Sequence, residues 1–552
     1  MKPRKAGRWS RCLGALALVG LGVFAPLGGA MAVTRASSDP LVVVERAWPP
    51  TLHVVVQLQS GALADPTGLE GRAALCWDAA VRAGGGLDRK AFATRLEALG
   101  ARLDADVGRH GTQIAISGLA EHADAMFALL ADVVLRPGLA ASDVDEAREQ
   151  LRAGIAARED DDEATASDAL VRYALRGDVA GRPIDGDPAT LGKIDAKACR
   201  ALVEAAVAGV RVDIGVGGAL DAKTAHALTR KHFAPLLAPR RAAGTAANRS
   251  SAGPGRDGRR LLLIDHPGRN AAQVALAIPT SGATAPGATA LVVADAVLGG
   301  AFTSRLSHQI RELRGWTYSI GSHLQAGPRH GLWSLAWAPR NAVVAKSIDL
   351  ALRQLELAAL DGATRREVAF ARDFLRGSQR QAVETAGEEL AARLRVRALG
   401  LPDDWLAGFE GRLAAVDGKA TAAAMKRLAP SDVVVVVVGD AARLRPQLEA
   451  MASGFAVEVL PRGGVPELTR QPGRAAAPTP ARPQVREEGD DEIGPDFDEK
   501  GEVVDAPPPV TPTADESEDD GDDEDADGDT DADDAADESA DAAPAAGKGA
   551  AR

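Results

Sequence analysis

Apolar and polar positions along the chain form a pattern of short strands and longer helices that occurs twice. Predominantly apolar runs of about five to seven residues, bounded by polar or turn-forming residues, predict strands. They are Leu41–Glu45, His53–Gln59 and Val210–Val216 in the first half, and Leu261–Asp265, Gln273–Ile278 and Val433–Val438 in the second. Between them, apolar residues recur every three or four positions, which predicts helices.

The order of these elements indicates the fold class. Ala91–Leu99 and His122–Val134 are predicted helices, and an alternating strand pair, Arg102–Asp106 and Gln113–Ser117, lies between them. Strands that follow one another and are separated from groups of helices indicate an α+β protein rather than a doubly wound sheet. We therefore expect two homologous lobes, each a mostly antiparallel sheet with helices packed on it.

Three landmarks support a duplication. Gly68 and Gly287 precede equivalent predicted helices and lie 219 residues apart. A helix containing Ala147–Gly154 recurs as Ala371–Gly377, 224 residues further along. The last strand ends Val-Gly-Gly in the first half and Val-Gly-Asp in the second. Landmarks in the same order at nearly the same offset indicate an internal repeat.

The two ends of the chain differ from the duplicated body. The first 32 residues contain five basic residues and no acidic one, and an apolar run is followed by Ala30-Met31-Ala32. This pattern predicts a cleaved secretory signal and export to the periplasm or the extracellular space, with an uncleaved anchor as the alternative. The predicted parts are a signal at 1–32, the first lobe at 33–240, a linker at 241–260, the second lobe at 261–460 and a disordered acidic, Pro/Ala/Asp-rich tail at 461–552.

Composition and charge narrow the possible functions. The net charge of −13 is concentrated at the C-terminus, where residues 487–552 contain 27 acidic and 3 basic residues. The remaining body is mildly basic without a basic stripe, which argues against a nucleic-acid partner. Beyond the signal, no apolar run is long enough for a membrane span. Three cysteines are too few for a disulfide framework, and the sequence leaves open whether Cys76 and Cys199 pair.

One long string carries a family resemblance. Residues 298–319 read Leu-Gly-Gly-Ala-Phe-Thr-Ser-Arg-Leu-Ser-His-Gln-Ile-Arg-Glu-Leu-Arg-Gly-Trp-Thr-Tyr-Ser. The string resembles the second-lobe signature of the pitrilysin/insulinase family of zinc metallopeptidases, the inverzincins, and weaker matches occur at Asp65–Leu69 and Leu96–Leu103. Members of this family enclose substrates between four such lobes, within one chain or between two. The resemblance implies that this chain supplies two of them.

The family's zinc motif is absent from the matching positions. In the family, His-x-x-Glu-His on a helix supplies two ligands and the general base, and a second Glu further along completes the site. Here the five positions read Gly71-Arg-Ala-Ala-Leu75, so that Ala74 replaces the base. Glu149 alone matches the distal ligand, and Ala156 replaces its supporting acid. We therefore expect no catalytic residue, no metal ligand and no cofactor in this chain.

The second lobe retains the other half of the family's site. In active members, an Arg and a Tyr contact the substrate backbone and the developing oxyanion opposite the zinc. Arg311 and Tyr318 match this pair, so the resemblance assigns substrate binding to them. An Arg fork and a phenol donor suit a carbonyl oxygen that gains charge. The alternative is an ordinary ion pair between Arg311 and a nearby acid. We also expect Gly315 to end a helix and Tyr318 to lie on the following strand.

The resemblance further implies a division of labour between two chains. In some members one subunit carries the zinc motif and the other carries the Arg/Tyr pair. We expect this chain to be an exported, non-zinc subunit that is inactive alone. Its expected partner is a zinc-bearing family member, with which it acts as a heterodimer on peptides or unfolded proteins. The alternatives are a catalytically dead structural or peptide-binding envelope protein, and a stand-alone zinc metallopeptidase with unrecognised ligands.

Overall fold

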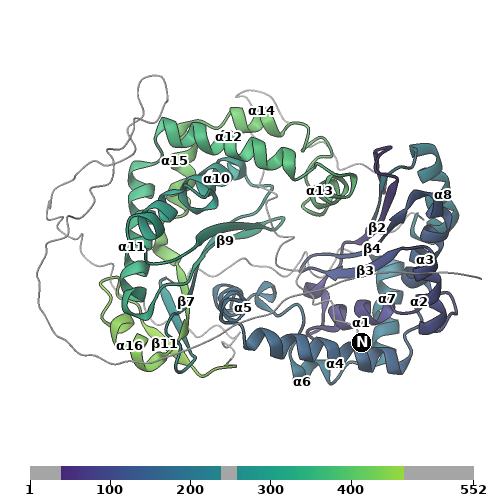
Figure 1. The fold of residues 1–552 in the computed structure, drawn as a ribbon, viewed down its shortest axis with the longest axis horizontal. Helices are drawn as coiled ribbons and strands as arrows, with labels where there is room; N and C mark the ends of the chain where they lie inside the picture. Colours follow the sequence, from purple (N-terminus) through teal and green to yellow (C-terminus); the bar gives the residue numbers. More distant parts are fainter. Residues whose placement is uncertain (1–38, 238–257, 465–552) are drawn as a thin grey trace, which may run out of the picture. The chain divides into compact units, whose positions relative to one another are not determined.

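The computed structural model of the protein describes residues 39–237 and 258–464. The predicted signal, most of the predicted linker and most of the predicted tail lie outside these residues. The described chain forms two sheets, each with its own hydrophobic core (Figure 1). Among the described helices, none combines the length with the apolar character that crossing a bilayer requires.

The first sheet has five strands in the order β1-β5-β2-β4-β3. They are β1 (Leu41–Glu45), β2 (Thr51–Leu58), β3 (Arg102–Val107), β4 (Thr112–Leu119) and β5 (Val212–Gly218). Strand β5 inserts between β1 and β2, parallel to the former and antiparallel to the latter. The remaining pairs, β2 with β4 and β3 with β4, are antiparallel, as the sequence predicted for this lobe.

The second sheet repeats this arrangement and adds a strand at one edge. Its order is β11-β6-β10-β7-β9-β8. The strands are β6 (Arg260–Asp265), β7 (Gln273–Ser281), β8 (Ile320–Ala326), β9 (His330–Trp337), β10 (Val434–Gly439) and β11 (Val457–Leu460). The strands predicted from the sequence are confirmed, with ends shifted by at most three residues. No residue ranges were predicted for β8, β9 or β11, and β11, at four residues, is too short to show a clear alternation.

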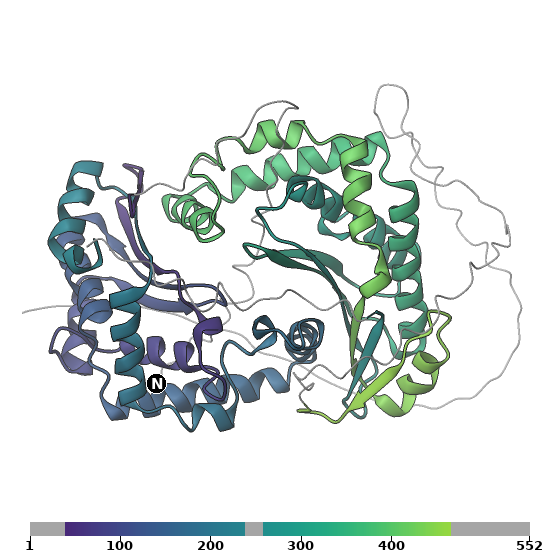
Figure 2. The ribbon, with the colours of Figure 1, turned by 180° about the vertical axis from the view of Figure 1, so that it is seen from behind.

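Helices of the same half cover one face of each sheet. On the first sheet they are α1 (Arg72–Ala80), α2 (Arg89–Ala98), α3 (Ala123–Leu135), α4 (Ala141–Glu159), α7 (Ala196–Gly209) and α8 (Ala222–Leu237). On the second sheet they are α10 (Ala288–Asp295), α11 (Val344–Asp361), α12 (Arg365–Gln381), α14 (Phe409–Ala414), α15 (Gly418–Arg427) and α16 (Ala441–Glu449) (Figure 2). The mostly antiparallel sheets with packed helices confirm the predicted α+β class with two homologous lobes.

The two remaining long helices cross from one half to the sheet of the other. Helix α5 (Asp162–Ala174) belongs to the first half by sequence, yet it packs on β7 and β10 of the second sheet. Helix α13 (Ala386–Ala398) belongs to the second half and packs on β1 and β5 of the first sheet. The two helices begin 224 residues apart, the offset that relates the landmark segments of α4 and α12. The duplicated halves therefore exchange equivalent helices.

Apolar contacts bury both exchanged helices. Leu170 and Tyr173 of α5 lie in a buried cluster with alternate residues of the second sheet, including Leu262 and Val436. Leu390 and Leu394 of α13 lie in a second cluster with Val42 and Val44 of β1. Because strand residues alternate between faces, these clusters occupy the face of each sheet opposite its own helices.

Glycines in β5 make room for α13. An ideal Cβ built at Gly215 would lie 2.8 Å from Cδ1 of Leu390, and one at Gly217 would lie 2.9 Å from the carbonyl oxygen of Ala386. Both distances are below 3.0 Å, closer than a real Cβ approaches another heavy atom. The Gly-Val-Gly sequence of β5 therefore allows the helix to approach the strand closely.

Buried polar contacts fix the positions of the exchanged helices on the sheets. Arg397 of α13 donates to the carbonyl oxygen of Asp39 at 2.7 Å and pairs with Asp213 at 3.4 Å and Asp403 at 2.9 Å. On the other side, Arg260 of β6 donates to the carbonyl oxygen of Tyr173 at 2.8 Å. These contacts supply the hydrogen bonds that buried charges require.

The exchange predicts that the two halves unfold together. Truncation of Leu390 or of Leu170 to alanine should lower the free energy of unfolding by about 2–5 kcal/mol, because each side chain is almost fully buried at an exchanged interface. Both variants should keep a single transition in thermal or urea unfolding. The control Leu360→Ala alters a side chain that is 76% exposed and should change stability by less than about 0.5 kcal/mol. Two separate transitions, with only one shifted by the substitution, would contradict coupled unfolding.

Candidate functional site

The segment after α10 carries the family signature and is built from two π-helical turns. The first, η5, spans Ala296–Gly300, and the second, η6, spans Ser307–Glu312. Between them Phe302 projects into solvent, with 74% of its surface exposed. Wide π-type turns are rare and occur frequently at functional sites. The signature segment is therefore locally unusual as well as similar in sequence.

Arg311, near the end of η6, is held by two neighbours. Its guanidinium carbon lies 3.7 Å from the centre of the Phe302 ring. Its Nη2 donates to Oε1 of Glu312 at 2.7 Å, and His308 contacts the same carboxylate through Nδ1 at 2.9 Å. These two bonds, that of His308 first, lower the pKa of Glu312. The ion pair weighed as the alternative for Arg311 is thus present, and the stacked ring leaves the side chain in a defined orientation.

Tyr318 is the most exposed of the large apolar and aromatic side chains described, at 96%. Its hydroxyl has no hydrogen-bond partner among the described residues. The expected position on a strand is wrong, because Tyr318 lies in a bend two residues before β8 begins. Helix η6 ends at Glu312, and Gly315 follows with φ of 57°, a conformation that favours glycine. The bend leaves the phenol without neighbours, whereas a strand would have aligned it with the sheet.

A buried carboxylate behind this segment was missed by the sequence analysis. Asp295, the last residue of α10, accepts hydrogen bonds from Oγ of Ser322 at 2.5 Å and from Nε1 of Trp333 at 2.7 Å. Burial raises the pKa of Asp295, while the two bonds oppose that shift. The contacts tie α10 to β8 and β9 next to Tyr318. A lone aspartate in an otherwise apolar helix was the signal that could have revealed it.

The positions of the zinc motif hold no ligands. Gly71 precedes α1 with φ of 88°, and Leu75 is fully buried in the core. Glu149 on α4 is an exposed residue paired with Arg152 at 2.9 Å. A small pocket beside these positions is lined by Ala74, Asp78, Ala105, Asp106, Val107, Leu151 and Asp185. Within the described ranges, no group of three or more His, Cys, Asp or Glu side chains is placed to hold a metal ion. These residues do not fit catalytic zinc.

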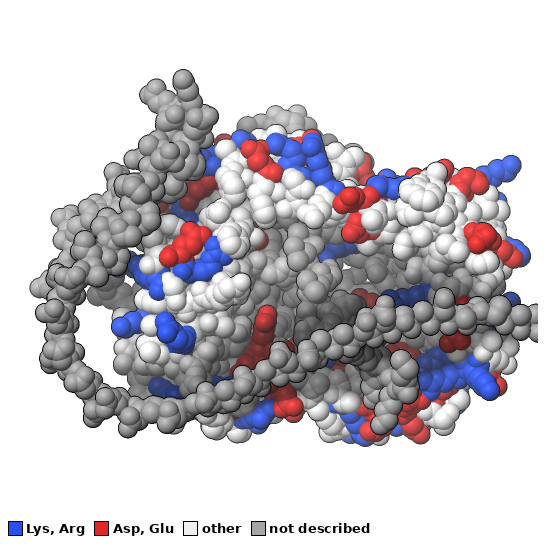
Figure 3. All heavy atoms as spheres, in the orientation of Figure 1, with Lys and Arg blue, Asp and Glu red and all other residues white. Residues whose placement is uncertain are grey.

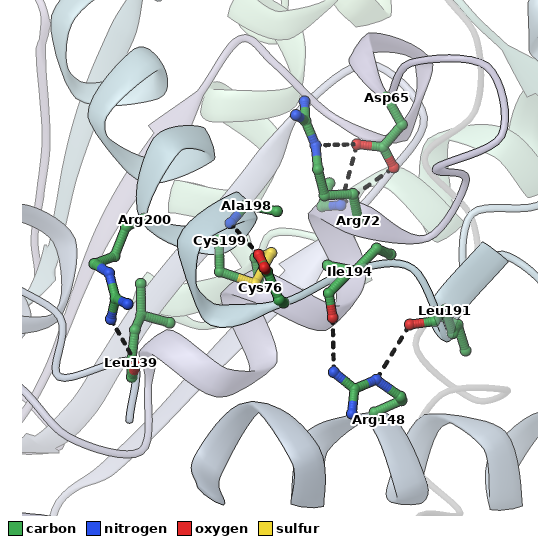
Figure 4. The surroundings of a disulfide bond; sticks show 12 residues. Asp65, Arg72, Cys76, Leu139, Arg148, Leu191, Ile194, Ala198, Cys199 and Arg200 are labelled. Atoms are coloured by element: carbon green, nitrogen blue, oxygen red, sulfur yellow. Dashed lines mark hydrogen bonds and ion pairs between the residues drawn. A yellow bond between two sulfur atoms is a disulfide. The ribbon is translucent and has the colours of Figure 1, made fainter. Parts of the chain in front are cut away.

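Helix α1 is instead fixed by a cap and a disulfide (Figure 4). Both carboxylate oxygens of the buried Asp65 accept from the backbone N–H of Ala73, at 3.1 and 3.2 Å. Burial raises the pKa of Asp65 to about 6, against the opposing effects of this bond and of the nearby Arg72. Cys76 is bonded to Cys199 of α7, which settles the pairing that the sequence left open.

Comparison with known proteins identifies the family. Residues 41–187 match the family described as insulinase (peptidase family M16), and residues 193–375 match the peptidase M16 inactive domain. Together the two matches span more than half of the chain. The chain therefore belongs to the insulinase family of peptidases, M16, as the string at residues 298–319 predicted.

Curated relatives include mycobacterial proteins named uncharacterized zinc proteases. One from Mycobacterium tuberculosis is 30% identical over 288 residues, which cover 52% of this chain and 65% of that protein. One from Mycobacterium leprae is 31% identical over 288 residues, which cover 52% of this chain and 64% of that protein. The match thus spans slightly less than two thirds of the length of these relatives.

Solved structures share the fold. The M16 inactive domain from Pseudomonas fluorescens superposes with a TM-score of 0.65 at 21% identity, over 72% of this chain and 95% of that one. The periplasmic protease PqqL from Escherichia coli superposes with a TM-score of 0.61 at 13% identity, over 76% of this chain and 49% of that one. At these identities the likeness establishes the architecture of two M16-like lobes and nothing finer.

The residues at the motif positions predict that the purified chain holds no stoichiometric zinc. One exposed carboxylate cannot retain zinc against water, because catalytic sites use three protein ligands. We expect elemental analysis after dialysis against zinc to find well below one equivalent, unchanged in Glu149→Gln. One tightly held zinc per chain that disappears in Glu149→Gln would contradict this expectation.

The disulfide predicts a large loss of stability on its removal. Cys76 and Cys199 enclose a loop with a sequence separation of 123, and both are fully buried. The chain-entropy account of disulfides gives about 4–5 kcal/mol for a loop of this length. We expect the double variant Cys76→Ala/Cys199→Ala to lose a free energy of unfolding of about this size. Urea unfolding would show the loss as a lower midpoint. An unchanged midpoint would show that the bond contributes nothing to folding.

Proposed function

We propose that this chain is the non-zinc subunit of a two-chain M16 peptidase. In this proposal it places Arg311 and Tyr318 beside a substrate whose scissile bond is held at the zinc of a partner family member. The partner carries an intact His-x-x-Glu-His motif and all of the metal chemistry. The substrate is a peptide or an unfolded protein, and the chain alone is inactive.

The observation that carries this proposal is the solvent exposure of the Tyr318 side chain. A phenol that is 96% exposed and has no hydrogen-bond partner among the described residues contributes nothing to folding that the structure shows. Its position in the signature segment, close behind Arg311, supports a role toward a molecule outside the chain. A phenol donor and a cation are the groups that stabilise charge on a carbonyl oxygen during acyl transfer.

The motif positions support the need for a partner. Gly71 and Leu75 replace the two histidines, and Leu75 is buried among apolar neighbours. The substitution of an alanine for the base at position 74 removes the proton acceptor as well. In this proposal the chain supplies the Arg311/Tyr318 pair but no zinc site. Its active site is therefore complete only when a second chain supplies the zinc ligands and the general base.

Export is part of the proposal. The predicted signal at residues 1–32 supports it, although it lies outside the described residues. The bond between Cys76 and Cys199 supports it independently, because stable disulfides form in oxidising compartments such as the periplasm. One structural neighbour is a periplasmic protease, which is consistent with the same location.

The competing function is peptide binding without catalysis. The ion pair between Arg311 and Glu312 favours it, because a neutralised guanidinium is a weaker partner for an oxyanion. The exposed ring of Phe302 would then serve as an apolar contact for a bound peptide. Under this alternative, substitution of Arg311 or Tyr318 alters peptide affinity without altering any chemical step.

Turnover by the reconstituted pair separates these possibilities. The partner is obtained by co-purification from the native host, and hydrolysis of an unfolded protein is measured with both subunits at equal occupancy. Tyr318→Phe removes only a hydroxyl and should lower kcat by about 10²–10³, the effect of losing one oxyanion donor. Arg311→Ala should have a similar effect.

The matched control is Arg314→Ala, which removes an exposed arginine of the same turn that stacks on Trp316. It should leave kcat unchanged. Unchanged kcat for Tyr318→Phe and Arg311→Ala, at an unaltered thermal midpoint, would refute the shared site. A change confined to KM would favour binding without catalysis.

A further inference from the structure

Thr317 is a buried residue directly before the exposed Tyr318. It is 7% exposed, although it lies in the loop between η6 and β8. Its hydroxyl lies within donating distance of two carbonyl oxygens, that of Ser319 at 2.8 Å and that of Ala338 at 3.2 Å. The hydroxyl oxygen also accepts from the backbone N–H of Ala338 at 3.3 Å. One side chain thus joins the loop to the residue that follows β9.

These bonds take the place of the next residue pair in the sheet. Strands β8 and β9 are antiparallel, and Ile320 is paired with Trp337. The same register would place Ser319 opposite Ala338 and continue the strand. Instead, the hydroxyl of Thr317 contacts both backbone groups of Ala338. A side chain that satisfies backbone groups in this way competes with strand pairing and allows the chain to bend.

The bend is anchored on both sides of Tyr318. Before it, the backbone N–H of Gly315 donates to the carbonyl oxygen of Arg311 at 3.0 Å, and Trp316 packs against the core of the second half. After it, Ile320 packs against the same core. The backbone around Tyr318 is therefore fixed, while its phenol is 96% exposed. A donor that is already held in place loses little freedom when it binds, which is the basis of preorganisation.

A second contact joins the following strand to the signature segment. Ser322 of β8 donates to Asp295 at 2.5 Å. An ideal Cβ at Gly299 would lie 2.6 Å from Oγ of Ser322, and one at Gly300 would lie 2.9 Å from Oδ2 of Asp295. The two glycines thus allow η5 to pack directly on this pair. Both ends of the segment that contains the bend are therefore held in place.

The charges seen in Figure 3 give weight to individual donors. Basic and acidic side chains are interspersed on that face of the described residues, and no broad region of one sign is seen there. A broad region of one sign would orient a charged ligand over a distance. Where it is missing, the placement of single donors decides how a peptide lies.

We propose that Thr317 is a positioning residue that holds the phenol of Tyr318 in place for the substrate. The inference rests on the proposed function and extends it to a residue that touches neither the substrate nor the zinc. Thr317 acts through the backbone of the bend. Removal of its hydroxyl leaves the backbone groups of Ala338 unpaired and releases the bend. Misplacement of a group by about 1 Å can lower a rate by about 10²-fold.

Turnover by the reconstituted pair measures this effect. Thr317→Val removes the hydroxyl, keeps a side chain of similar shape, and should lower kcat by about 10-fold to 10²-fold with little change in KM. Thr317→Ser retains the hydroxyl and should keep kcat close to the wild-type value. The control Thr421→Val removes an equally buried hydroxyl on α15, which donates to the carbonyl oxygen of Asp417 at 2.9 Å, and should leave kcat unchanged.

A double-variant cycle shows whether Thr317 acts through Tyr318. In the Tyr318→Phe background, Thr317→Val should cause almost no further loss of kcat, because the donor that it positions is already absent. A general structural role of Thr317 would instead lower kcat by the same factor in both backgrounds. Losses that multiply therefore overturn the inference.

Amide hydrogen exchange of the mature full-length chain adds a measurement that needs no partner. Exchange at Ala338 should be faster in Thr317→Val and unchanged in Thr317→Ser and Thr421→Val. Unchanged exchange in Thr317→Val overturns the inference whatever the turnover. Slow turnover of Tyr318→Phe beside wild-type turnover of Thr317→Val overturns the inference alone. Wild-type turnover of Tyr318→Phe refutes the proposed function, and the inference that rests on it, even where exchange shows that Thr317 holds the bend.

Discussion

The reciprocal packing of α5 and α13 is the constraint on which the rest of the structure depends. Each sheet is apolar on both faces over its central strands, and helices of its own half cover only one of them. The second face is closed by the equivalent helix of the other half, through Leu170 and Tyr173 on one side and Leu390 and Leu394 on the other. A half without its counterpart would expose this apolar surface to water, which is unfavourable in proportion to its area. Duplication followed by exchange therefore makes the two halves one cooperative unit.

This constraint also determines which surfaces remain available. Helix α13 covers β1 and β5 of the first sheet, and α5 covers β7 and β10 of the second. In the second sheet α5 does not reach the edge strand β8, which begins two residues after Tyr318 and carries His323. The signature segment, the bend at Tyr318 and the exposed edge are thus continuous along the chain. Asp295 secures that segment from behind by binding Ser322 and Trp333.

The first half has kept the helix of the zinc motif and lost its chemistry. In a zinc-bearing site, metal–ligand bonds contribute to holding such a helix in place. Here α1 is held by the buried cap Asp65 and by the bond between Cys76 and Cys199. Apolar burial of Leu75 replaces a ligand with a core contact. The helix is therefore held by structural contacts among the described residues.

The sequence by itself determined the elements, the duplication, the family and the loss of the zinc ligands, because these depend on local patterns and on residue identity. Through the resemblance of residues 298–319 to the family signature, it singled out Arg311 and Tyr318 as candidate site residues. The structure alone showed that Cys76 meets Cys199, that Tyr318 lies in a bend, and that Asp295 is buried behind it. It also showed the exchange of α5 and α13. Periodicity reveals that a helix has an apolar face, but apolar burial is non-directional, and only the assembled sheets decide which surface that face covers.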